Sequence, residues 1–195
     1  MRNLILATII WSAAPLASAA GQQAPAPSGP PTAVLVSGPE EGQEAPDFSL
    51  AWANKDGVGA GPYWSLSGQR GKVVVLAFYP KDFTSGCTAE MKAFTAQYAT
   101  LFGPDVVVVG INQDSLETHA RFAQSEQMPF SLLTDPGQRV SKLYGSADAS
   151  GYNRRTIFVI NRKGKVAYLD LRFGALNPKS YDELKAAVQS ARSSS

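Results

Sequence analysis

The chain has 195 residues, of which 44% are apolar and 17% are charged. This composition is enough for one ordinary globular core and predicts a single folded domain. The formal net charge is only +2 and no block of like charge stands out, so we expect neither a nucleic acid nor an acidic membrane surface as a partner.

The first twenty residues have the layout of a secretory signal peptide. Arg2 is the single basic residue, an apolar run extends from Leu4 to Trp11, and the small residues Ala17-Ser18-Ala19 follow. The apolar run is too short to remain as a bilayer anchor, although a retained anchor is the alternative. We therefore predict a signal peptide over residues 1–20 and an exported protein, periplasmic or secreted, with no stable membrane insertion after cleavage.

Residues 21–39 are rich in Pro, Gly, Gln and Ala. Such a composition cannot bury enough apolar surface to fold, so we predict a linker. The folded domain is then expected to cover residues 40–195. At its start, Phe48 to Ala53 and Tyr63 to Leu66 are predicted to form a hairpin. Its Gly-rich tip lacks the helix and the lysine of a phosphate-binding loop, so we interpret the tip as a flexible loop.

Two buried strands and two helices follow in alternation. Lys72 to Tyr79 and Asp105 to Asn112 are nearly continuous, valine-rich apolar runs, which is typical of strands buried on both faces. Apolar residues at helical spacing predict a helix from Cys87 to Phe102. Asp114 is expected to cap the second helix, with Glu117 three residues further on. This order predicts parallel strands with right-handed crossovers.

The C-terminal third adds antiparallel strands and a last helix. A short helix is expected from Val140 to Tyr144 after a turn. Thr156 to Ile160 and Lys165 to Leu169 are predicted to pair as a hairpin, and Asn177-Pro178 to open a helix that reaches about Gln189. The predicted fold class is therefore α/β, with a central mixed sheet flanked by helices.

Cys87 is the only cysteine in the sequence. It follows the first buried strand, at a place where ligand sites form in such sheets. A free cysteine is often only a small buried hydrophobe, but a single cysteine in an exported protein indicates a reactive thiol or an intermolecular bond. With one Cys and one His, a closed zinc site of the usual kind is impossible, and we expect neither a metal nor a cofactor.

A reactive thiol needs help from its surroundings. It attacks as the thiolate, and only about 3% of an unperturbed thiol is ionised at pH 7. A helix N-terminus contributes about 0.3–1 kcal/mol, which is too little to ionise it. A hydroxyl donor and a fixed cation are therefore expected near Cys87. Thr84, three residues before it, and an arginine from elsewhere in the chain are the candidates.

The segment YPKDFTSGCT contains a known signature. Pro80, Thr84 and Cys87 match the Pro-x-x-x-Thr-x-x-Cys pattern of the peroxiredoxins, and Glu90 also fits. Further matches follow in order along the predicted domain, at Ala45 to Phe48, Gly71-Lys72, Asp114-Ser115, Pro129 to Asp135, Tyr144-Gly145 and Arg155 to Ile160. The chain resembles most the branch of the bacterioferritin comigratory protein. The resemblance implies a thioredoxin-like fold and a thiol peroxidase that reduces hydrogen peroxide and organic hydroperoxides.

The resemblance also implies a role for each matching residue. Cys87 would be the peroxidatic cysteine, which attacks a peroxide oxygen and becomes a sulfenic acid. Thr84 would hydrogen bond to the thiolate and the peroxide, and Pro80 would shield the site from water. Arg155 would stabilise the thiolate and the charge that builds on oxygen as the O–O bond breaks, and Glu90 would orient Arg155.

Arg154 precedes Arg155, and adjacent residues of a strand point to opposite faces, so only one of the two can reach the sulfur. Aligning Phe158 to Asn161 with the pattern of the family selects Arg155.

The chain departs from the resembling branch at two positions. Ser85 stands where that branch usually has proline, so we expect a more mobile loop. Lys92 stands where many members have a resolving cysteine, and an intramolecular disulfide is impossible. The sulfenic acid would therefore be reduced by an external thiol, from a thioredoxin-like protein, a glutaredoxin-like protein or a small thiol, and would be prone to over-oxidation.

The residues leave three alternatives to a thiol peroxidase. A cysteine hydrolase would pair Cys87 with a histidine, and His119 is the only candidate. Because His119 lies two elements away from Cys87, we interpret it as a solvated helix residue. An exported thioredoxin-like thiol–disulfide oxidoreductase would use Cys-x-x-Cys, whereas Glu90 occupies the third position after Cys87. A non-enzymatic binding or holdase module would not need the Pro, Thr, Cys and Arg set.

Overall fold

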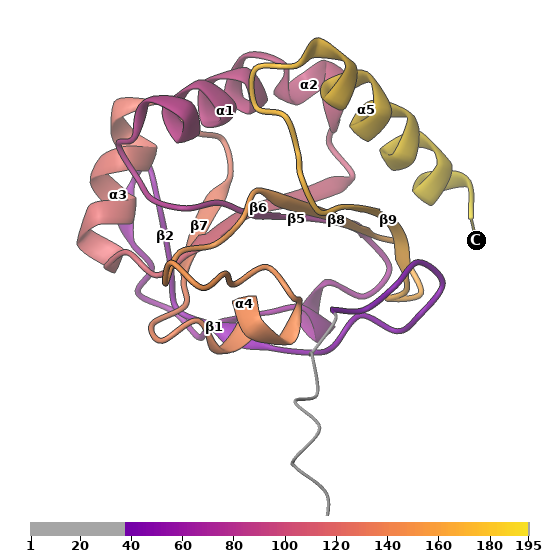
Figure 1. The fold of residues 1–195 in the computed structure, drawn as a ribbon, viewed down its shortest axis with the longest axis horizontal. Helices are drawn as coiled ribbons and strands as arrows, with labels where there is room; N and C mark the ends of the chain where they lie inside the picture. The colour runs from indigo at the N-terminus through magenta and orange to yellow at the C-terminus, as the bar shows by residue number, and fades with distance from the viewer. Residues whose placement is uncertain (1–37, 195) are drawn as a thin grey trace, which may run out of the picture. The chain divides into compact units, whose positions relative to one another are not determined.

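A seven-stranded mixed sheet lies at the centre of the structure, a computed structural model that describes residues 38–194 (Figure 1). Its strands are β2 (Trp52–Asn54), β3 (Gly57–Val58), β5 (Val73–Phe78), β6 (Val106–Asn112), β7 (Ser131–Thr134), β8 (Thr156–Ile160) and β9 (Val166–Asp170), in the order β3-β2-β7-β6-β5-β8-β9. β5, β6 and β7 pair in parallel, and the other pairs are antiparallel. The predicted mixed α/β sheet is confirmed.

The predicted signal peptide, residues 1–20, and residues 21–37 of the predicted linker lie outside the described residues. Between residues 38 and 194, no helix is both long enough and apolar enough to cross a membrane.

β5 is the strand that carries the site. All six of its side chains are buried, as its run of apolar residues predicts for a strand covered on both faces. Its last residue, Phe78, lies opposite Ile111 of β6 on one side and opposite Thr156 of β8 on the other. The end of β5 and the start of β8 therefore meet at the same edge of the sheet.

The helices are α1 (Ser85–Ala96), α2 (Tyr98–Leu101), α3 (Leu116–Ser125), α4 (Arg139–Leu143) and α5 (Pro178–Ser193). Figure 1 shows α1, α2 and α5 over one face of the sheet, α3 beside β7 and β2, and α4 on the opposite side with β1 (Ser49–Leu50). The last helix starts where the sequence predicts, because the Asn177 side chain accepts a hydrogen bond from Lys179 N, and it continues four residues beyond Gln189.

Two of the predicted helix boundaries are wrong. The single helix expected from Cys87 to Phe102 begins at Ser85 and is interrupted at Gln97, whose φ of −103° and ψ of 9° leave the helical region. The cap of α3 is Ser115 rather than Asp114. The Ser115 hydroxyl accepts from Thr118 N, whereas the Asp114 carboxylate accepts from the backbone of Asp82.

The predicted N-terminal hairpin forms only in part. β1 (Ser49–Leu50) pairs antiparallel with β4 (Trp64–Ser65) in a separate two-stranded sheet, and a 3₁₀ turn (Ser67–Gln69) follows. β2 instead joins the central sheet beside β7. The run from Phe48 to Ala53 is therefore divided at Ala51, whose carbonyl accepts from Thr134 N at 3.1 Å.

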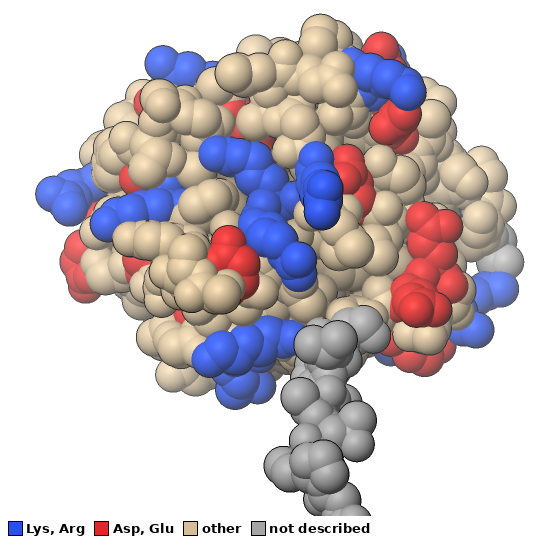
Figure 2. Space-filling view, in the orientation of Figure 1, with Lys and Arg blue, Asp and Glu red and all other residues tan. Residues whose placement is uncertain are grey.

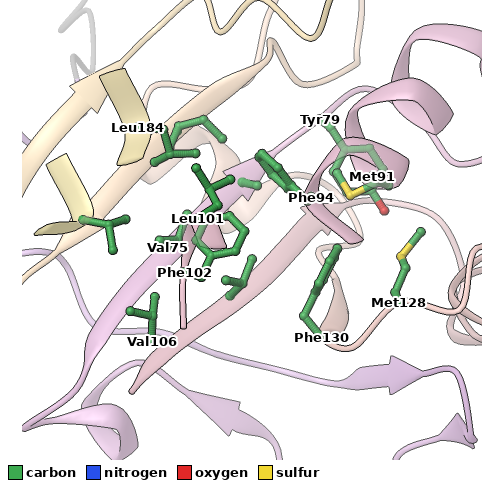
Figure 3. Close-up of a cluster of buried hydrophobic side chains, with 14 of the residues drawn as sticks. Val75, Tyr79, Met91, Phe94, Leu101, Phe102, Val106, Met128, Phe130 and Leu184 are labelled. Carbon is green, nitrogen blue, oxygen red and sulfur yellow. The ribbon is translucent and has the colours of Figure 1, made fainter. Parts of the chain in front are cut away.

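A large apolar cluster fills the space between the sheet and helices α1, α2 and α5 (Figure 3). Figure 3 shows Met91 of α1 next to Tyr79, the residue that follows β5. Each fully buried large apolar side chain of this kind stabilises the fold by about 1.5–3 kcal/mol. Cys87 belongs to the same cluster. Packing therefore holds the first turn of α1 against the carboxyl end of β5.

Candidate active site

Cys87 is the third residue of α1, and its side chain is fully buried. The six residues from Tyr79 to Thr84 connect the end of β5 to this helix. Sheets of this kind place ligand sites beyond the carboxyl ends of their strands. The sulfur therefore lies where the sequence predicts, in the first turn of a helix at the edge of the sheet.

Arg155 is brought to this edge from 68 residues further along the chain. It immediately precedes β8, whose first residue pairs with the last residue of β5. Its Nη2 lies 3.2 Å from Cys87 Sγ, and its Nη1 donates to Glu90 Oε2. One guanidinium group thus connects the thiol with a carboxylate, in the fixed fork geometry that arginine provides.

Glu90 is fully buried one turn after Cys87 on α1. Burial raises the pKa of its carboxyl to about 7, against the opposite effect of Arg155. Among the described residues, Glu90 Oε1 has no hydrogen-bond partner. For Arg155, burial lowers the pKa, but the charges of Glu90 and Cys87 outweigh burial, so that its pKa lies above the ordinary value. The arginine therefore stays charged, whereas the protonation of Glu90 changes near neutral pH.

Gly86 leaves the room that Arg155 occupies. A Cβ atom at this position would lie 2.9 Å from Arg155 Nη2, closer than real Cβ contacts allow. Gly86 is not among the site residues predicted from the sequence. Its only signal there is a glycine directly before the cysteine, within a helix, where glycine is otherwise unfavourable.

Thr84 occupies the cap position of α1 with extended backbone angles. Its hydroxyl donates to the carbonyl of Lys81 at 3.1 Å, and its own carbonyl accepts from Thr88 N. The expected hydrogen bond from Thr84 to the sulfur therefore stays a prediction and requires the hydroxyl to turn. Pro80 lies half-buried at the bend after Tyr79, and its shielding role also stays a prediction.

Arg154 points away from the sulfur. Its guanidinium donates to the carbonyl of Gly145 and lines a cavity of about 330 Å³ together with Phe158 and Leu169. The side chains of the two adjacent arginines therefore point to different sides of the sheet, as the alternation of extended backbone requires.

Within residues 38–194, no group of three or more His, Cys, Asp or Glu side chains is placed to hold a metal ion. On the face drawn in Figure 2, Lys and Arg side chains are interspersed with Asp and Glu, and neither sign covers the surface.

A family model described as the AhpC/TSA family matches residues 41–169. The chain belongs to the AhpC/TSA family. The chain is 37% identical over 135 residues to a Coxiella burnetii protein named peroxiredoxin bcp. This alignment covers 66% of the chain and 85% of that protein. The chain is also 33% identical over 135 residues to peroxiredoxin Bcp of Bacillus subtilis, covering 65% and 82%.

The fold of this peroxiredoxin also has solved counterparts. The bacterioferritin comigratory protein of Xanthomonas campestris superposes with a TM-score of 0.64 at 21% identity, covering 74% of this chain and 92% of that one. At this identity the likeness shows the fold, which is thioredoxin-like, as the sequence predicts.

Within residues 38–194, the Lys92 side chain forms an ion pair away from Cys87 and Arg155. Its Nζ lies 3.6 Å from Glu126 Oε2, and its side chain is 64% exposed. The pair connects α1 with the residue after α3. Lys92 is therefore a surface residue at the position where many members of the resembling branch have a resolving cysteine.

The prediction that His119 is a solvated helix residue is wrong. Its side chain is fully buried, and its Nδ1 lies 2.8 Å from Oδ2 of Asp82, in the loop before α1. The reason is that His119 shares a face of α3 with Phe122, three residues later, and this face packs inward. That spacing is visible in the sequence, but the partner Asp82 is not.

Proposed function

We propose that this peroxiredoxin is a thiol peroxidase that reduces hydrogen peroxide and organic hydroperoxides through Cys87 alone. The observation that carries the proposal is the 3.2 Å contact between Arg155 Nη2 and Cys87 Sγ. A fixed cation at the sulfur favours the thiolate over the thiol. It is also the donor needed where negative charge develops on a peroxide oxygen.

In the first step, the Cys87 thiolate attacks one oxygen of the hydroperoxide. A sulfur–oxygen bond forms, the O–O bond breaks, and the leaving oxygen takes up a proton to become water or an alcohol. The thiolate becomes a sulfenic acid. Arg155 donates to the developing oxygen charge, Glu90 orients Arg155, Thr84 hydrogen bonds to the peroxide, and Pro80 keeps water out.

The peroxide is expected to approach along the guanidinium group. Cys87 and Glu90 are fully buried, whereas the Arg155 side chain is 22% exposed. Of these three residues, Arg155 is thus the one that reaches solvent. A hydroperoxide bound to the exposed side of the Arg155 guanidinium group can reach the neighbouring sulfur once the loop before α1 moves away.

The second step uses thiols from outside the chain, because Cys87 is the only cysteine in the sequence. One external thiol condenses with the sulfenic acid to a mixed disulfide and releases water. A second thiol then displaces Cys87 and leaves as the oxidised reductant. We propose a thioredoxin-like protein, a glutaredoxin-like protein or a small thiol for this role. The N-terminal sequence supports the further proposal that both steps occur after export, in the periplasm or outside the cell.

The experiment follows both steps in wild type and Cys87→Ser. One equivalent of hydrogen peroxide is added without reductant, and free thiol and intact mass are measured. We expect complete loss of thiol and a gain of one oxygen in wild type, and no gain in the variant. Peroxide consumption with a panel of thiol reductants then identifies the class that supports turnover. Turnover that persists in Cys87→Ser would overturn the proposal.

A further inference from the structure

The segment from Lys81 to Ser85, which leads into α1, has one buried side chain. Among residues 81–85, only Asp82 is buried, and the other four side chains are exposed. This segment therefore gains almost no stability from apolar burial of its own. Its position depends on what holds the Asp82 carboxylate, and Thr84 and Cys87 follow that residue by two and five positions.

The Asp82 carboxylate accepts three hydrogen bonds from three different parts of the chain. Its Oδ1 accepts from the Tyr79 hydroxyl at 2.6 Å and from Asn112 Nδ2 at 2.9 Å. Its Oδ2 lies 2.8 Å from His119 Nδ1. An ionised carboxylate can only accept, so this network assigns the proton to His119 Nδ1. The backbone N–H of Asp82 is held as well, by Asp114 Oδ2 at 2.8 Å.

The neighbouring residue ties the loop to the same face of α3. The ring of Phe83 lies 4.8 Å from the ring of Phe122, three residues after His119. Phe83 also has a φ of 57°, in the left-handed region that bulky residues avoid. Such a conformation persists only where the surroundings enforce it, and it occurs preferentially at functional sites. The contacts of Asp82 and Phe83 with α3 enforce it here.

We propose that Asp82 and His119 are positioning residues, which hold the loop so that Thr84 and Cys87 meet the peroxide in the reactive arrangement. This inference rests on the proposed function and adds two residues to it. His119 acts through its Nδ1 donor, not as an acid or base. Its Nε2 is buried and has no hydrogen-bond partner within residues 38–194.

The test compares two substitutions at one position, His119→Leu and His119→Asn. The Nδ2 of asparagine takes nearly the place of the imidazole Nδ1 and can donate to Asp82, but asparagine has no counterpart of Nε2. The second-order rate of hydrogen peroxide with the reduced full chain is measured by stopped flow. We expect His119→Leu to react about tenfold or more slowly, since small misplacements cost that much, and His119→Asn to stay close to wild type.

A second readout separates positioning from general damage. Iodoacetamide alkylates the same sulfur but needs no aligned donors. In His119→Leu, we expect alkylation to be as fast as in wild type or faster, while the peroxide reaction slows. The matched control is Ser141→Ala, which removes a 2.7 Å hydrogen bond to the buried carboxylate of Asp135. It should lower stability and leave both rates unchanged.

The outcomes separate the inference about Asp82 and His119 from the proposed function. If the wild type reacts rapidly with hydrogen peroxide and His119→Leu reacts equally rapidly, the inference alone is overturned. The same holds if His119→Asn reacts with hydrogen peroxide as slowly as His119→Leu. A parallel loss of peroxide and alkylation rates also overturns it. If His119→Leu does not fold, the same two rates are measured in Asp82→Ala, and a peroxide rate equal to that of wild type overturns the inference. A wild-type thiol no faster than free cysteine overturns both the inference and the proposed function.

Discussion

Arg155 Nη2 and Cys87 Sγ lie 3.2 Å apart although 68 residues separate them in the chain. The register of the sheet explains the contact, because Thr156 of β8 pairs with Phe78 of β5. A shift of one residue in that register would present Arg154 instead, since alternate residues of a strand face opposite sides. The site therefore depends on the pairing of β5 with β8 as much as on the motif around the cysteine.

The first prediction separates the two arginines. Arg155→Ala removes the donor at the sulfur, and we expect the reaction with hydrogen peroxide to slow by about 100-fold or more. Arg154→Ala removes a contact with the Gly145 carbonyl on the other side, and we expect little change. Stopped-flow rates of both variants check this. If Arg154→Ala is the slower variant, the assignment of Arg155 is wrong.

The second prediction concerns the space at Gly86. Gly86→Ala places a Cβ 2.9 Å from Arg155 Nη2 and pushes the guanidinium from the sulfur. We expect about a tenfold slower peroxide reaction. Stability should hold or rise, because alanine favours a helix over glycine by up to about 1 kcal/mol. The control is Gly61→Ala, where an added Cβ meets no atom within 4 Å. Equal rates for Gly86→Ala and wild type would refute the steric argument.

The third prediction is a pH dependence of stability that belongs to Glu90. Its pKa is raised from 4.5 to about 7, first by burial and against the effect of Arg155. Between these values the folded state binds more protons than the unfolded state. The contribution of Glu90 is thus fully present below pH 4.5 and is lost as pH rises through 7.

Glu90→Gln removes this titration. Between pH 5 and pH 8, we expect the free energy of unfolding in urea to fall in wild type relative to Glu90→Gln, by up to roughly 3 kcal/mol. Parallel pH profiles for the two proteins would contradict the assignment.

The fourth prediction follows from the single cysteine. Without reductant, one equivalent of peroxide should add about 16 Da, and a large excess should carry Cys87 on to a gain of about 32 Da, the sulfinic acid. Lys92→Ala should behave identically, because the Lys92 side chain is 64% exposed and pairs with Glu126. Intact mass spectrometry measures both. A product that remains at about 16 Da in excess peroxide would show that the sulfenic acid is protected.

The elements with the clearest sequence signal are those buried on both faces. The valine runs of β5 and β6 predict their strands almost to the residue, because a continuous apolar run has few other uses in a mixed sheet. Alternation along a strand predicted that only one of Arg154 and Arg155 reaches the sulfur, and the alignment of Phe158 to Asn161 with the family pattern selected Arg155. The boundaries at Gln97 and Ala51 were missed, because backbone angles and exchange between two sheets leave no periodic signal.

The buried polar contacts were the least predictable part of the site. Asp82 and His119 are 37 residues apart, and although the spacing of His119 and Phe122 indicates a buried face, nothing in the sequence pairs His119 with Asp82. Only the fold places the loop before α1 against α3. Glu90 shares the buried face of α1 with Cys87 and Phe94, but a carboxylate at that position gives no sequence signal for its burial, and its contact with Arg155 comes only from the fold.

The most direct test of the account is the second-order rate constant of the reduced Cys87 thiol with hydrogen peroxide at pH 7, measured by stopped flow beside free cysteine. A thiolate held by Arg155, with a donor preorganised for the leaving oxygen, predicts a rate constant at least about 100-fold above that of free cysteine. A thiol that reacts no faster than free cysteine would contradict the central claim.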